Sequence, residues 1–195
     1  MKKIALAAIL ASILSTNVQA DALGIYFGGQ IWDNQASGVF GDGSSQIDFN
    51  LADEKQQSFF IAFEHPLPMI PNIRIASTSL ETKGNTALAT EFEFQDETFQ
   101  EGTQVNANFN ISYVDYTLYY ELFDNDLLTF DFGLTGRDFD GDVTVSAQGT
   151  SGSETVTQSA SVTVTDIVPM LYVHTSLGLP LTGLNLYAQG NFLSI

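Results

Sequence analysis

Apolar and polar residues alternate strictly along two segments between Tyr113 and Leu134, and a short polar turn joins the segments. The apolar positions are Val114, Tyr116, Leu118, Tyr120 and Leu122 in the first segment and Leu128, Phe130, Phe132 and Leu134 in the second. A period of two is that of a β-strand, so the stretch predicts a hairpin with one apolar face and one polar face. Strands of about ten residues also match the thickness of a bilayer core.

Two environments suit such a hairpin. In a transmembrane β-barrel the apolar face meets lipid and the polar face lines the interior. In a soluble β-sandwich the strands alternate as well, but the apolar face points inward. Alternation alone does not separate these interpretations, so the start of the chain and the lengths of its loops have to decide between them.

The first twenty residues have the three parts of a secretory signal peptide. Lys2 and Lys3 form a basic start, residues 4–14 are a short apolar run, and Val18-Gln19-Ala20 resembles a cleavage site. The apolar run is too short to span a membrane as a helix. We therefore expect a bacterial exported protein that is cleaved after Ala20, with one mature domain over residues 21–195.

Further strands follow the same alternation through the mature chain. They are predicted over residues 22–33, 58–64, 73–81, 86–94, 105–111, 143–147, 155–175 and 184–195. Long loops and short turns succeed one another between the strands, as in outer-membrane barrels. The predicted fold is therefore all-β, an up-and-down antiparallel transmembrane β-barrel. The apolar positions change from even to odd numbers after Leu134, which predicts a bulge at Gly136 or Gly141.

The predicted barrel has seven membrane strands, whereas bacterial single-chain barrels normally have an even number. The sequence also reaches Ile195 without a last strand that ends in an aromatic residue. We expect an eight-stranded type of barrel whose last strand is missing, so that the domain over residues 21–195 is incomplete at its C-terminus. Unpaired strand edges would be costly in lipid.

Charge and cysteine content narrow the choice of partners. The chain has 6 basic and 23 acidic residues and no cysteine. Loss of Lys2 and Lys3 with the signal peptide leaves four basic residues against 23 acidic ones, a net charge of −19. Such a chain repels nucleic acid, whereas its acidic loops are candidate sites for divalent cations. Without disulfides, the fold must rely on burial and on hydrogen bonds between strands.

The first strand carries a Gly-Gly pair, Gly28-Gly29, within the segment Leu23–Trp32. This segment resembles the start of an uncharacterised family of small bacterial outer-membrane β-barrel proteins. Similar pieces lie at Tyr116–Glu121, Asp138–Val143, Val168–Tyr172 and Leu179–Leu184. The resemblance implies an outer-membrane barrel with no known activity. It also implies a chain that continues past the position of Ile195.

Carboxylates occur on the predicted polar face of the central hairpin, and two arginines are candidate partners for them. We call these five residues the interior polar cluster: Asp115, Glu121, Asp131, Arg74 and Arg137. A barrel of eight strands is nearly filled by its own side chains. Ion pairs within a packed interior are therefore favoured over a conducting pathway.

Other polar residues give weaker signals for chemistry. Asp138, Asp140 and Asp142 resemble the start of a calcium-binding loop, but the glycine and the closing glutamate of that loop are missing. His65 and His174 lie beside predicted short turns, and no serine has the setting of an activated nucleophile. We predict no enzyme activity, no metal site and no cofactor.

Three functional hypotheses remain after these observations. The first is a monomeric outer-membrane barrel, surrounded by lipid, with a structural or surface-interaction role through acidic extracellular loops. The second is a small cation-preferring pore, to which carboxylates in the interior would contribute. The third is a soluble periplasmic β-sandwich that binds a ligand.

Overall fold

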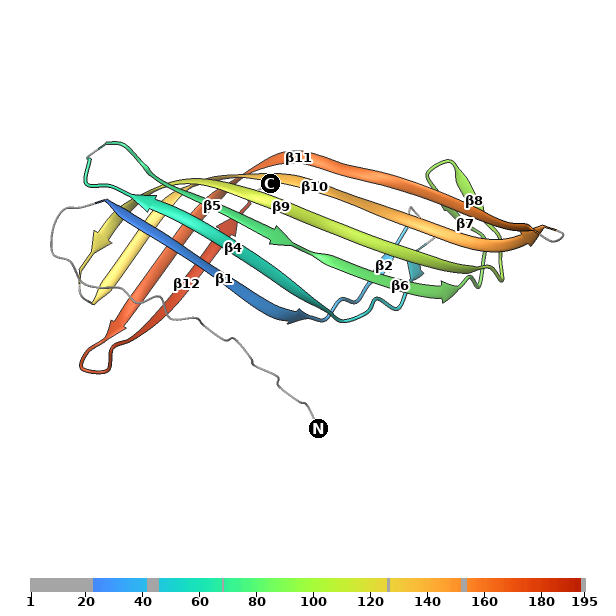
Figure 1. Cartoon of the computed structure of the whole chain (residues 1–195), viewed down its shortest axis with the longest axis horizontal. Helices are drawn as coiled ribbons and strands as arrows, with labels where there is room; N and C mark the ends of the chain where they lie inside the picture. The colour runs from blue at the N-terminus through green and yellow to red at the C-terminus, as the bar shows by residue number, and fades with distance from the viewer. Residues whose placement is uncertain (1–22, 42–45, 68, 126, 152–153, 194–195) are drawn as a thin grey trace.

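A computed structural model describes residues 23–41, 46–67, 69–125, 127–151 and 154–193, so the predicted signal peptide lies outside the described residues. An antiparallel sheet of eight strands makes up most of the structure (Figure 1). The strands are β1 (Gly24–Asn34), β4 (Glu54–Glu64), β5 (Asn72–Ser79), β6 (Glu81–Ala87), β9 (Gln104–Asp124), β10 (Leu128–Ser151), β11 (Glu154–Leu179) and β12 (Leu184–Phe192). Two short hairpins pair β2 (Val39–Phe40) with β3 (Ile47–Asp48) and β7 (Phe92–Phe94) with β8 (Glu97–Phe99).

Seven strands lie side by side in the order β1-β4-β5-β9-β10-β11-β12, and β6 pairs with β9 beyond the end of β5. The sheet curls strongly into a half-barrel and does not close. Within the described residues, β1 pairs only with β4 and β12 only with β11. The predicted all-β antiparallel class is therefore confirmed. No helix in the described part of the chain is long and apolar enough to cross a membrane.

The three longest strands extend well beyond the predicted hairpin. β9, β10 and β11 contain 21, 24 and 26 residues and run along most of the molecule (Figure 1). We call the end where β9 passes into β10 the turn end, and the opposite end, which carries β7 and β8, the loop end. The predicted strands 105–111 and 143–147 are the parts of β9 and β10 that approach the loop end. The predicted strand 86–94 is instead divided between β6 and β7.

The predicted bulge at Gly136 or Gly141 is wrong. β10 keeps one unbroken register with β9 from Asp131 to Ala147, and the register shift lies at Phe130, near the turn end. The change from even to odd apolar positions has another cause. Apolar residues move from one face of the sheet to the other, while the backbone alternation continues without interruption.

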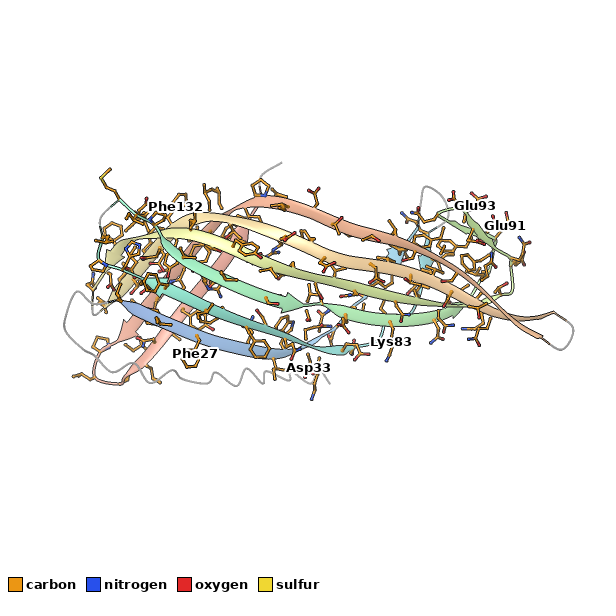
Figure 2. The ribbon with its side chains drawn as sticks, turned by 45° about the horizontal axis from the view of Figure 1, so that its top comes forward. Phe27, Asp33, Lys83, Glu91, Glu93 and Phe132 are labelled. Atoms are coloured by element: carbon orange, nitrogen blue, oxygen red, sulfur yellow. The ribbon has the colours of Figure 1, made fainter. Side chains whose placement is uncertain are left out.

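The inner, concave face is polar in the half of the sheet nearest the turn end. Asp115 and Thr117 are only 4% and 1% exposed there, whereas Leu118 and Leu134 on the outer face are 50% and 62% exposed. Other exposed apolar residues of this half include Ile25, Phe27, Ile31, Phe59, Ile61, Ile73, Ile75, Ile167, Leu171, Leu184 and Leu186. Figure 2 shows Phe27 and Phe132 in this half of the molecule. The orientation is the reverse of the one that a soluble sandwich requires.

The same inner face becomes apolar toward the loop end. Val105 of β9 and Val145 of β10 are fully buried on it. Phenylalanines from the short hairpins and the adjoining loops pack against these valines: Phe49, Phe92, Phe94 and Phe99. Burial of these aromatic side chains from water stabilises the loop end as a small hydrophobic core. One continuous sheet therefore has a polar interior in one half and an apolar interior in the other.

Candidate functional site on the concave face

The concave face of the turn half collects most of the buried polar side chains of the described residues. Cross-strand register brings them together, because directly opposed residues on neighbouring strands point to the same face. Curling of the sheet then brings strands that are not neighbours within reach of one another. Asn191 of β12 thus donates from Nδ2 to Asp115 Oδ2 of β9 at 3.1 Å, across two intervening strands.

Asp115 and Arg137 form a buried ion pair at the centre of this face. They are opposed in the register of β9 and β10. Arg137 Nε donates to Asp115 Oδ1 at 2.8 Å, and Nη2 donates to Oδ2 at 2.9 Å. The guanidinium carbon also lies 3.8 Å from the ring centroid of Tyr113. A bidentate pair with a stacked aromatic ring holds the arginine side chain in one orientation.

Asp131 pairs with a histidine rather than with an arginine. Its Oδ2 lies 2.8 Å from His174 Nδ1, and the two residues are opposed in the register of β10 and β11. Asp131 Oδ1 is buried and has no hydrogen-bond partner among the described residues. The arrangement orients an imidazole as in catalytic pairs, but no hydroxyl within the described structure donates to His174. The geometry thus orients the imidazole but places no hydroxyl beside it among the described residues.

Two tyrosines flank a glycine nearer the turn end. Gly133 lies between Tyr119 of β9 and Tyr172 of β11 in the register, and the two rings are 5.6 Å apart. A Cβ atom at Gly133 would lie 2.2 Å from the carbonyl oxygen of Leu118, so a larger residue does not fit. Tyr119 donates its hydroxyl to Glu64 Oε1 at 2.7 Å. Tyr119 and Glu64 thus form a third, partly buried polar contact, which joins β4 to β9.

The interior polar cluster is only partly assembled by these contacts. Asp115 and Arg137 meet, and Glu121 is opposed to Asp131 in the register but lies exposed near the turn end. Arg74 also lies on the concave face, and it makes no ion pair among the described residues. Sequence reasoning missed His174, Tyr119 and Glu64 as members of this site. The sequence signal that could have identified these three residues is that each is a polar residue at an inward-facing position of a strand.

The cavity on this face has a volume of about 330 Å³. Its lining includes Tyr26, Glu64, Arg74, Glu121, Asp131 and His174. Within the described residues, no group of three or more histidine, aspartate or glutamate side chains is arranged to hold a metal ion. Asp138, Asp140 and Asp142 alternate along β10 with inward residues such as Val143, so they lie on the outer face. The cavity thus brings carboxylates, an imidazole and a guanidinium together on the concave face.

Comparison of the chain with protein-family models, with curated proteins and with solved structures gives no match. The resemblance to small outer-membrane barrels therefore stays a prediction that rests on the sequence segments described above.

Proposed function

We propose that this protein is an outer-membrane β-barrel protein with a surface-interaction role. In this proposal lipid surrounds its turn half, and its loop half projects into the external medium. The observation that carries the proposal is that the inner face of one continuous sheet is polar in the turn half and apolar in the loop half. A lipid-facing segment needs an apolar outer face, whereas a segment in water needs its apolar residues inside.

The outer face of the turn half supports this proposal. From the turn end, the outer positions of β1 and β10 are uncharged until Asp33 and Asp138 are reached. An exposed leucine or phenylalanine side chain costs about 1.5–3 kcal/mol in water relative to an apolar medium. A band of such residues around the whole half-barrel would therefore be strongly unfavourable in water and favourable in lipid.

The loop end supports an interaction through acidic side chains. Phe92 and Phe94 of β7 are buried in the loop-end core, so Glu91 and Glu93 point outward into solvent. Figure 2 shows both glutamates at this end, far from Phe27. A surface with this excess of carboxylates attracts cations and basic partners and repels anionic ones. The proposed partner of this surface is therefore cationic.

The alternative of a cation-preferring pore receives less support from the interior. The carboxylates of Asp115 and Asp131 are both held by side chains of the same chain, Arg137 and His174. Such contacts engage the carboxylates and fill space, as expected for a small packed barrel. The interior thus favours a structural role for these groups over conduction.

Single cysteine variants test the membrane location, because the native chain has no cysteine. In isolated outer membranes, Leu118→Cys should resist a membrane-impermeant maleimide, and Glu93→Cys should react readily. Leu118→Cys labelled as fast as Glu93→Cys would overturn the proposal.

A second experiment tests the surface role. A variant with both Glu91→Gln and Glu93→Gln should bind polylysine more weakly than the wild type, and the Asp138→Asn variant is the control for loss of charge elsewhere. Equal binding by all of these proteins would exclude the β7 glutamates from that role.

A further inference from the structure

Arg74 carries a largely buried charge that is not directly paired in the described structure. The residue is only 9% exposed, yet within the described residues the guanidinium has no hydrogen bond and no ion pair. Asp115 pairs with Arg137 and Glu64 accepts from the hydroxyl of Tyr119, while Asp131 contacts His174 through one oxygen, so none of these three carboxylates pairs with the guanidinium. A largely buried guanidinium without a direct partner is unfavourable, so this group is suited to receive an anion from outside the chain.

The Gly-Gly pair of β1 explains how the guanidinium is held in place. Gly28 is opposed to Phe60 of β4, and a Cβ atom on Gly28 would lie 2.6 Å from the Phe60 ring. The ring therefore lies over the glycine on the concave face. The guanidinium carbon of Arg74 in turn sits 4.4 Å from the centroid of the Phe60 ring. The ring face attracts the cation, so Gly28, Phe60 and Arg74 form one built support across three strands.

The cavity beside this support has the size and lining of a small-molecule site. Its volume of about 330 Å³ is at the lower end of the range for ligand pockets. Aromatic rings of Tyr26, Phe60 and Tyr172 line it next to Arg74. Carboxylates such as Glu121 line the same cavity, so its overall charge is negative apart from the region around Arg74.

We propose that this cavity binds a small organic monocarboxylate with an aromatic or apolar body. The guanidinium of Arg74 would hold the carboxylate through its fork of donors, and the body would lie against the rings of Phe60 and Tyr26. A phosphate group with two charges is less suited, because the carboxylates of the cavity repel it more strongly. A neutral ligand is also less suited, because it leaves the guanidinium unpaired.

Three ligands of similar shape test the proposal with the wild-type protein. Benzoate, benzamide and phenyl phosphate are titrated into the protein refolded in detergent micelles, and NMR chemical shifts follow binding. We expect saturable binding of benzoate, with benzamide and phenyl phosphate each at least tenfold weaker. Absence of saturable benzoate binding, or equal affinity for benzamide, would overturn the proposal. Since the protein is studied in micelles, failure of this test leaves the proposed membrane location unaffected.

Substitution of the arginine locates the site. Arg74→Met should weaken benzoate binding at least tenfold, and Arg74→Lys should weaken it less, because a lysine keeps the charge without the planar fork. Lys83→Met is the matched control, since it removes one exposed positive charge on β6 and should bind like the wild type. Benzoate that binds Arg74→Met as tightly as the wild type would refute the assignment. If Arg74→Met does not fold, the Arg74→Lys comparison and the ligand series decide the question.

Discussion

The buried pair of Asp115 and Arg137 allows a quantitative test of the interior. Arg137→Met removes both hydrogen bonds to Asp115, whose side chain is only 6% exposed. Asp115 would then keep one hydrogen bond, from Asn191 at 3.1 Å. Removal of one partner from a buried pair leaves an uncompensated charge and typically costs about 3–5 kcal/mol. We expect a loss of this size in the free energy of unfolding of Arg137→Met.

The reciprocal variant and the double variant complete a thermodynamic cycle. Asp115→Asn should cost less, about 2–3 kcal/mol, because Arg137 is 18% exposed and keeps its contact with the ring of Tyr113. The double variant contains no buried charge at this position, so its loss should be smaller than that of Arg137→Met alone. The single variants should therefore be strongly non-additive, with a coupling energy above about 2 kcal/mol.

Urea unfolding in phospholipid vesicles measures these differences, with the fluorescence of Trp32, the only tryptophan, as the signal. Lys83→Met serves as the control, because its pair with Glu54 spans 3.6 Å and is largely exposed. This variant should change the free energy of unfolding by less than about 0.5 kcal/mol. Additive losses in the cycle, or an Arg137→Met loss no larger than that of Lys83→Met, would refute the picture of a packed, charge-paired interior.

Three further substitutions probe other parts of the fold by the same unfolding assay. Gly28→Val should destabilise the protein by about 1–3 kcal/mol, since its side chain would collide with the ring of Phe60, and an unchanged stability would show that the ring is free to move. Gln56→Leu should cost about 2 kcal/mol or more, because the buried Gln56 amide forms hydrogen bonds with both the N–H and the C=O of Glu81, where β5 ends and β6 begins. A loss below about 0.5 kcal/mol would contradict this role. Phe92→Ala should cost about 3–5 kcal/mol, since this ring is fully buried in the loop-end core, and a loss typical of surface sites would contradict that core.

Much of the fold could be predicted from the sequence because alternation specifies which face of a strand each side chain occupies. The polar side of the central hairpin, with Asp115 and Asp131, is the concave side in the structure. The glycine pair in the first strand also indicated that bulky neighbours lie beside it. In the structure, Gly28 and Gly29 lie against the rings of Phe60 and Phe59. The alternation and the glycine pair each lie within one short segment and could be recognised without tertiary contacts, whereas the rings beside the glycines come from β4.

Partners across strands could not be predicted in the same way. Asp131 and His174 are 43 residues apart and meet because of the register of β10 and β11, which the length of the connection between them does not reveal. The unpaired state of Arg74 likewise depends on how far the sheet curls and on which carboxylates other side chains engage. The cause of the change from even to odd apolar positions before Val143 could not be predicted from the sequence either. A bulge and a change of face produce the same numbering pattern, and only the continuous register of β9 and β10 distinguishes them.

The sequence by itself therefore determined the all-β class of the fold, its alternating strands and the two chemical faces of the central hairpin. The tertiary structure alone decided which face is concave in each half, which charges pair, and that Arg74 makes no direct ion pair in the described residues. The physical reason is the range of the interactions. Alternation arises from backbone geometry between adjacent residues, whereas curvature, register and burial arise from contacts between strands that are distant in the sequence.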